Sequence, residues 1–127
     1  MLGGMSDDLA RYLRQNPSHL PLNRQALDTA PEYLRSTVSM THSAFPDGLP
    51  LEDYFSLLYL FREQGFSDRG IAKAVQTCFD KEYADALHDV YRSDDPAPPL
   101  DKVERLRRHL LSHGFEAWEK EQHDAIS

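Results

Sequence analysis

The sequence has little of what marks an exported, membrane-spanning or disulfide-stabilised protein. It contains one cysteine, Cys78, which excludes an internal disulfide and fits a reducing compartment. No segment approaches the roughly 18 consecutive apolar residues of a transmembrane helix. The first eight residues lack both a cationic and an apolar segment, so we expect no signal peptide and a cytoplasmic location.

Motifs that would identify a reaction are also missing. No glycine-rich loop follows a predicted strand, so nucleotide binding by that route has no support. The paired carboxylates Asp7-Asp8 and Asp94-Asp95 flank loop-like segments, whereas general acid–base catalysis needs rigidly held carboxylates. Cys78 lies on an apolar helical stripe without a histidine near it in sequence, which is typical of a small buried hydrophobe. We therefore expect no catalytic residue, no cofactor and no enzymatic activity.

The periodicity of the apolar residues is helical almost throughout. The chain has 127 residues, of which 40% are hydrophobic, enough for the core of one domain. Apolar residues recur at intervals of three and four, and alternation with period two never persists. The pattern predicts an all-α fold, a compact bundle of five to seven short helices around a central helix at residues 51–64.

This central segment carries the widest apolar arc, about 200° at 100° per residue. We expect Leu57, Leu58 and Phe61, in the middle of the arc, to be almost fully buried. Leu60 stands apart in the polar arc, so a simple bundle would leave it in water unless the N-terminal segment or a second subunit covers it. The full arc comprises Leu51, Tyr54, Phe55, Leu57, Leu58, Tyr59 and Phe61.

Several residues are typical of helix ends. The run Thr29-Ala30-Pro31-Glu32 is typical of a capping box, with the glutamate three residues after the threonine. Gly65 fits a left-handed C-cap, and Phe66 can then fold back onto the preceding turn. Ser67 and Asp80 each fit the N-cap of a further helix.

We expect three regions along the chain. Residues 1–43 form an N-terminal helical extension that includes a helix from Asp7 to Gln15. Residues 44–118 form the helical core domain, to which Phe115 and Trp118 return after the last clear helix. Residues 119–127 are charged, and we expect them to form a frayed tail.

Turn residues within this predicted core domain are the basis of a resemblance to a known family. The run Phe45-Pro46-Asp47-Gly48-Leu49-Pro50 precedes Asp53-Tyr54 and a leucine-rich helix, and Gly114-Phe115 follows near the end. Over about residues 44–118, the chain resembles a small actinobacterial all-helical family classed only as a domain of unknown function. In that family a tryptophan stands at the place of Phe115, and the first 40 residues here look like an addition. The resemblance implies a compact helical bundle and says nothing about chemistry.

The clearest charge feature lies on the last clear helix. Residues 100–113 contain four basic and two acidic residues, whereas residues 44–99 contain eleven acidic and five basic residues. A cationic face of this kind can bind an acidic partner, dock on the acidic remainder of the chain, or simply be solvated. The face comprises Lys102, Arg105, Arg108, His109 and His113.

Two of these residues have the spacing of metal ligands. His109 and His113 lie four residues apart on one helix, which would suit a metal-dependent enzyme. The glutamate of the metalloprotease motif is absent, and Lys102 and Arg105 place positive charge beside them. We therefore expect no metal.

The sequence favours a non-enzymatic protein-interaction module, monomer or homodimer, with Lys102, Arg105, Arg108 and His109 as the partner-binding residues. The expected partner is an unidentified protein, for which the cationic face favours an acidic surface, and we expect no membrane. The alternative is a helix-turn-helix-like DNA-binding regulator using residues 67–92. Its second helix carries more acidic than basic residues, and the net charge of −7 opposes contacts with phosphate. Nucleic acid is therefore the less favoured partner.

Overall fold

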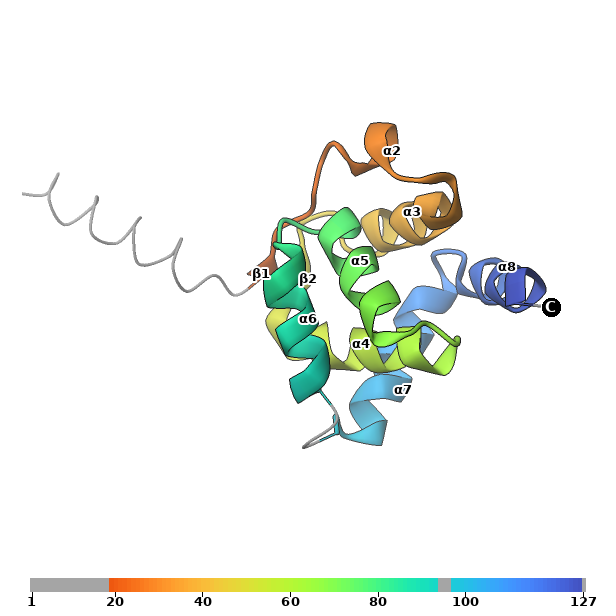
Figure 1. The fold of residues 1–127 in the computed structure, drawn as a ribbon. Helices are drawn as coiled ribbons and strands as arrows, with labels where there is room; N and C mark the ends of the chain where they lie inside the picture. Colours follow the sequence, from red (N-terminus) through yellow and green to blue (C-terminus); the bar gives the residue numbers. More distant parts are fainter. Residues whose placement is uncertain (1–18, 94–96, 127) are drawn as a thin grey trace, which may run out of the picture.

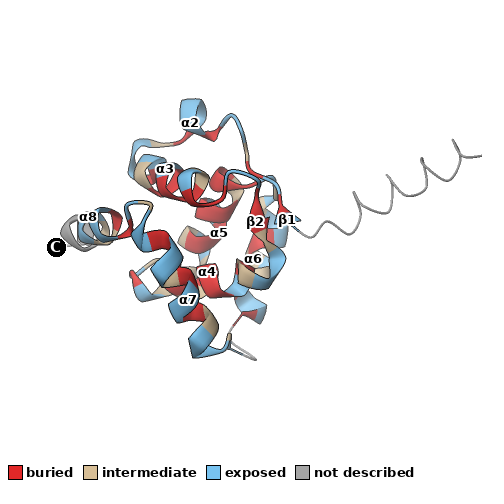
Figure 2. Ribbon diagram, turned by 180° about the vertical axis from the view of Figure 1, so that it is seen from behind, coloured by how far each residue is buried: buried red, intermediate tan, exposed pale blue. Residues whose placement is uncertain are grey.

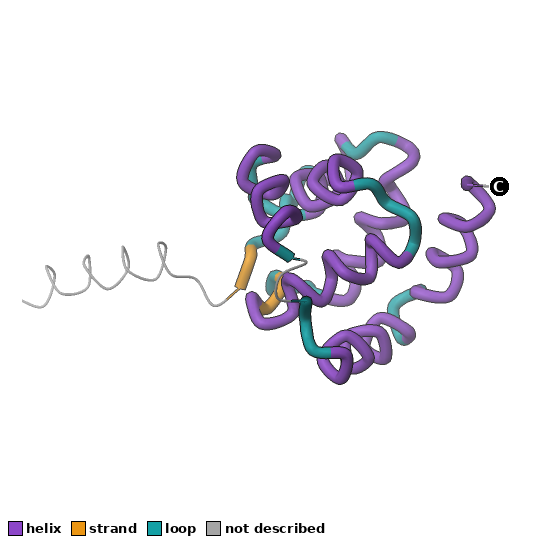
Figure 3. Tube along the Cα trace, turned by 60° about the horizontal axis from the view of Figure 1, so that its bottom comes forward, coloured by secondary structure: helices purple, strands orange, loops and turns teal. Residues whose placement is uncertain are grey.

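The computed structural model describes residues 19–93 and 97–126, the last four by their backbone alone. Seven α-helices and one two-stranded sheet make up this part of the chain (Figures 1 and 3), so the predicted all-α bundle of five to seven short helices is confirmed. The helix expected from Asp7 to Gln15 lies outside the described residues. In chain order the elements are β1 His19–Leu20, α2 Ala26–Thr29, η1 Glu32–Leu34, α3 Arg35–Ala44, β2 Leu49–Pro50, η2 Leu51–Asp53, α4 Tyr54–Glu63, α5 Asp68–Cys78, α6 Tyr83–Arg92, α7 Leu100–Leu111 and α8 Phe115–Ile126, where η marks a 3-10 helix.

The helices pack around one hydrophobic core. The α5–α6 pair has the most extensive packing, α4 packs against α5 and α7, and α3 packs against α2, α5, α7 and α8. Most of the buried helical residues belong to α3, α4 and α5 (Figure 2). That α4 is the central helix of the bundle stays a prediction. No helix in the described part of the chain is both long and apolar enough to cross a bilayer.

The buried arc of α4 has the predicted width but is rotated. Leu57, Leu58 and Phe61 are buried, as expected. Leu51 and Phe55, predicted to lie in the arc, are exposed, whereas Leu60 on the opposite flank is completely buried. The arc is thus turned by about one residue, or 100°. The expectation that Leu60 needs cover from the N-terminal segment or a second subunit is wrong, because Leu60 belongs to the core cluster of the described chain.

The rotation of the buried arc predicts that truncating Leu60 destabilises the protein much more than truncating Leu51. Leu60→Ala removes a fully buried side chain and should lower the free energy of unfolding by about 2–5 kcal/mol. Leu51→Ala, the matched control nine residues earlier in η2, should lower it by less than about 1 kcal/mol, since Leu51 is 45% exposed. Urea unfolding followed by circular dichroism measures both. Equal losses would contradict the observed orientation of α4.

An aromatic cluster joins α4 to α8. The ring of Phe61 stacks on Phe66 with a centroid distance of 5.3 Å, and Trp118 lies 5.9 Å from Phe61. The indole Nε1 of Trp118 donates a buried 2.8 Å hydrogen bond to Oγ1 of Thr37 on α3. Phe115 and Trp118 are both buried, so their predicted return to the core is confirmed.

Truncating Phe61 should open this cluster. Phe61→Ala removes a ring with no exposed surface and should lower the free energy of unfolding by about 3–5 kcal/mol. That is a large part of the roughly 5–15 kcal/mol of a typical domain. A thermal melt measures the effect. A melting temperature equal to that of the wild type would show that Phe61 does not contribute to the core.

Two of the predicted helix ends are confirmed and two are wrong. Gly65 has a φ of 92°, and Ser67 accepts a 3.0 Å hydrogen bond from the Gly70 amide as the N-cap of α5. Thr29 instead ends α2 and donates its hydroxyl to the Gln25 carbonyl, so it forms no capping box. Asp80 precedes α6 without capping it, because the N-cap position belongs to Glu82.

A short antiparallel sheet, which the helical pattern did not indicate, joins the start of the described chain to the turn after α3. His19 pairs with Pro50 and Leu20 with Leu49. Gly48 has a φ of 103°, and a Cβ added there would lie 2.8 Å from the Leu20 carbonyl oxygen. Only glycine therefore suits this position, because the strand passes against its Cα.

The packing and the backbone continue across both predicted region boundaries. Leu34 and Val38 lie before residue 44 and are buried in the same core cluster as residues of the predicted core domain. Beyond Glu119, α8 continues to Ile126.

Candidate functional site

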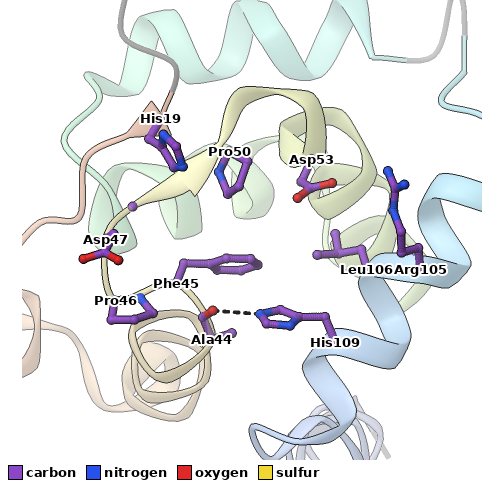
Figure 4. A pocket seen from close by; sticks show the side chains of 11 residues that line it. His19, Ala44, Phe45, Pro46, Asp47, Pro50, Asp53, Arg105, Leu106 and His109 are labelled. Atoms are coloured by element: carbon purple, nitrogen blue, oxygen red, sulfur yellow. Dashed lines mark hydrogen bonds between the residues drawn. The ribbon is translucent and has the colours of Figure 1, made fainter.

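A cavity with charged walls lies between the end of α3, the turn at residues 45–50, η2 and α7 (Figure 4). It has a volume of about 390 Å³, which falls at the small end of the range typical of ligand pockets. Its walls combine an apolar floor with charged and imidazole side chains. The lining residues are His19, Ala44, Phe45, Pro46, Asp47, Gly48, Pro50, Asp53, Arg105, Leu106 and His109.

A hydrogen bond between α7 and α3 shapes this cavity. The Nε2 atom of His109 lies 2.8 Å from the carbonyl oxygen of Ala44, at the end of α3. Because a carbonyl only accepts, Nε2 carries the proton. The imidazole also packs against the ring of Phe45, with centroids 5.4 Å apart, and the neighbouring Leu106 is buried. These contacts fix the part of α7 that presents Arg105.

The charges of the cavity are divided between its two sides. Asp53 and Arg105 lie at one side, and His19 and Asp47 lie at the other (Figure 4). Asp53 occupies the N-cap position of α4, but its carboxylate makes no cap hydrogen bond. Burial raises the pKa of this carboxyl above its usual value, and Glu52 raises it further, while the strongest opposing effect comes from Arg105.

The structure separates the four predicted partner-binding residues. Arg105 and His109 line the cavity, whereas Lys102 lines a smaller groove beside Leu51 and Phe55. Arg108 is exposed and lines neither of these. His109 is tied to α3 by its bond to the Ala44 carbonyl, so it acts as a positioning residue.

Arg107, on the other side of the same helix, forms ion pairs instead of lining the cavity. Its guanidinium pairs with Glu63 of α4 at 2.9 Å and with Glu104 at 3.1 Å. Residues two apart on a helix point about 200° away from each other. Arg107 therefore holds α7 against α4, while Arg105 faces the cavity.

Sequence reasoning missed Asp53, Phe45 and His19 as parts of this site. The position of Asp53 next to the apolar floor depends on where α7 packs. His19 reaches the cavity only through the unexpected strand pairing. The sequence signal that was available is the turn-rich run 45–50, which forms one wall.

The two histidines with metal-ligand spacing are engaged with α3. His113 Nδ1 lies 2.8 Å from the Ser43 hydroxyl, and the His109 and His113 rings lie 5.1 Å apart. Within the described ranges, no group of three or more histidine, cysteine, aspartate or glutamate side chains is placed to hold a metal ion.

The helix pair α5–α6 has the outline of the alternative DNA-binding motif, but its outer face is acidic. Glu82 and Asp85 are exposed on the would-be recognition helix. Lys81, the cation at its start, forms an ion pair with Asp89, whose carboxylate also accepts a 2.8 Å bond from the Tyr54 hydroxyl. This face would repel phosphate groups.

Cys78 lies in the core, away from the cavity. It has no exposed surface, and burial raises the pKa of its thiol to about 12. The thiolate is the reactive form, so the thiol is unreactive near neutral pH.

The chemical reactivity of Cys78 should reflect this burial. In the native protein an aromatic disulfide reagent should modify Cys78 at least about a hundredfold more slowly than in urea, because both burial and the raised pKa suppress the thiolate. Absorbance of the released thiol measures the rate. Similar rates in both conditions would contradict the buried position.

No protein-family model, curated protein or solved structure matches this chain. We therefore infer its function from the cavity and from the charges of α7.

Proposed function

We propose that this protein is a cytoplasmic, non-enzymatic interaction module that binds an acidic surface of a partner protein through α7. One observation carries the proposal: Lys102, Arg105 and Arg108 follow one another at intervals of three residues, and none forms an ion pair within the described chain. Arg107 on the same helix shows that α7 does pair its cations where they serve packing. The three others are left to solvent or to a partner.

The geometry of α7 suits this role. Val103, Leu106 and Leu110 are buried and fix the opposite side of the helix. The cations therefore project from a rigid support, which reduces the entropy lost when an acidic surface docks on them. Because the whole chain is acidic, this cationic row is a local feature that steers an anionic partner to one place.

A charge-reversal experiment tests the proposal with a defined probe, a fluorescent peptide of glutamate repeats. Arg105→Glu with Arg108→Glu should weaken binding of the peptide at least tenfold at low salt, as measured by fluorescence anisotropy. The matched control is Arg69→Glu with Arg92→Glu, which changes the net charge equally at two exposed arginines of α5 and α6. The control should bind within about threefold of the wild type.

Equal losses in both variants would show an effect of net charge alone and would contradict the proposal. Circular dichroism must show that both variants keep the helical content of the wild type.

The same pair of variants tests the DNA-binding alternative. Salt-sensitive binding of a DNA duplex that Arg69→Glu with Arg92→Glu abolishes would favour the regulator using residues 67–92. The interaction module predicts no such binding at physiological salt.

A further inference from the structure

The cavity holds two opposite charges that are not paired with each other. The Asp53 carboxylate and the Arg105 guanidinium both line it, and Arg105 exerts the strongest cationic influence on Asp53. Within the described residues, neither group makes a hydrogen bond or an ion pair. Each charge is therefore open to a ligand group of opposite sign.

Both charges are presented by well-held parts of the fold. Asp53 precedes Tyr54, which is buried and bonded to Asp89. Arg105 lies beside the buried Leu106 and one turn before His109, which is bonded to the end of α3. A pair of charges held apart in this way is preorganised for a ligand that bridges them.

The sign pattern narrows the class of ligand. A purely anionic molecule would meet the repulsion of Asp53 and Asp47, and a purely cationic one that of Arg105. A zwitterion can pair with both Asp53 and Arg105. Beside these two charges, the floor formed by Phe45 and Leu106 is apolar and buried, which suits a hydrocarbon side chain.

We propose that this cavity binds a free α-amino acid with an apolar side chain. The ligand carboxylate pairs with Arg105, its ammonium group pairs with Asp53, and its side chain packs on Phe45 and Leu106. The volume of about 390 Å³ exceeds that of one such molecule, so the ligand fits with space left for water. The raised pKa of Asp53 agrees with this role, since a bound ammonium group would replace the water that burial removes from the carboxylate.

Titration by nuclear magnetic resonance tests the proposal with three probes at about pH 6.5, below the pKa of an α-amino group. L-leucine carries both charges, N-acetyl-L-leucine only the negative one and L-leucinamide only the positive one. Leucine should bind with a Kd of about 1 mM or tighter and should shift the amide signals around Gly48 and Arg105. Each analogue should bind at least tenfold more weakly.

Single substitutions test the contribution of each charge to binding. Asp53→Asn and Arg105→Gln should each weaken leucine binding at least tenfold, and Arg69→Gln, a control at an exposed arginine of α5 outside the cavity, should leave it unchanged. The dispersion of the amide spectrum shows whether each variant is folded.

Binding of N-acetyl-leucine or leucinamide as tight as that of leucine would overturn the zwitterion assignment. Shifts confined to residues outside the cavity, or no shift with any probe, would overturn the site. Asp53→Asn leaves Lys102, Arg105 and Arg108 in place, so binding of the acidic peptide by this variant reports on the interaction module separately.

Discussion

The arrangement of the candidate site depends on one carbonyl group at the end of α3, that of Ala44, and on the donor that it finds outside its own helix. The last carbonyl groups of any helix lack donors within that helix, and a partly buried one must find a donor elsewhere. The Ala44 carbonyl finds it in the His109 imidazole, 65 residues later in the chain. This bond, with the contact between the imidazole and Phe45, fixes α7 beside the turn at residues 45–50. The cavity and the direction of the cationic row both follow from that placement.

The arginines of α7 differ in whether they form ion pairs. Arg107 is half-buried and joined to Glu63 and Glu104, so its charge contributes to packing between α7 and α4. Arg105 and Arg108 are exposed and leave their charge available. An exposed ion pair adds little to stability, so leaving these two cations unpaired costs the fold little. Because that cost is small, the surface of α7 is free to be adapted to a ligand or partner.

How much the sequence predicts depends on whether the signal is local. The Gly65 turn, the Ser67 cap and the burial of Phe61 depend on residues within a few positions of each other, and they were predicted correctly. The cations of α7 were likewise found from helical spacing. The orientation of α4 was not, because its aromatic and leucine residues make a broad apolar surface, and only packing of its neighbours selects Leu60 over Leu51 as a buried residue. The pairing of His19 with Pro50, and therefore the place of His19 in the cavity wall, depends on contacts between distant segments that no local pattern encodes.

The docking of α8 also constrains the order in which the chain can fold. Trp118 fills the space beside Phe61 and bonds to Thr37, which lies 81 residues earlier. Contacts across such a separation form late, because the intervening chain must be ordered before its ends meet. During synthesis on the ribosome, α3, α4 and α5 emerge well before α8, and until then Phe61 and the Thr37 hydroxyl lack their partner. Until α8 is synthesised and docks, this part of the core lacks the Trp118 side chain.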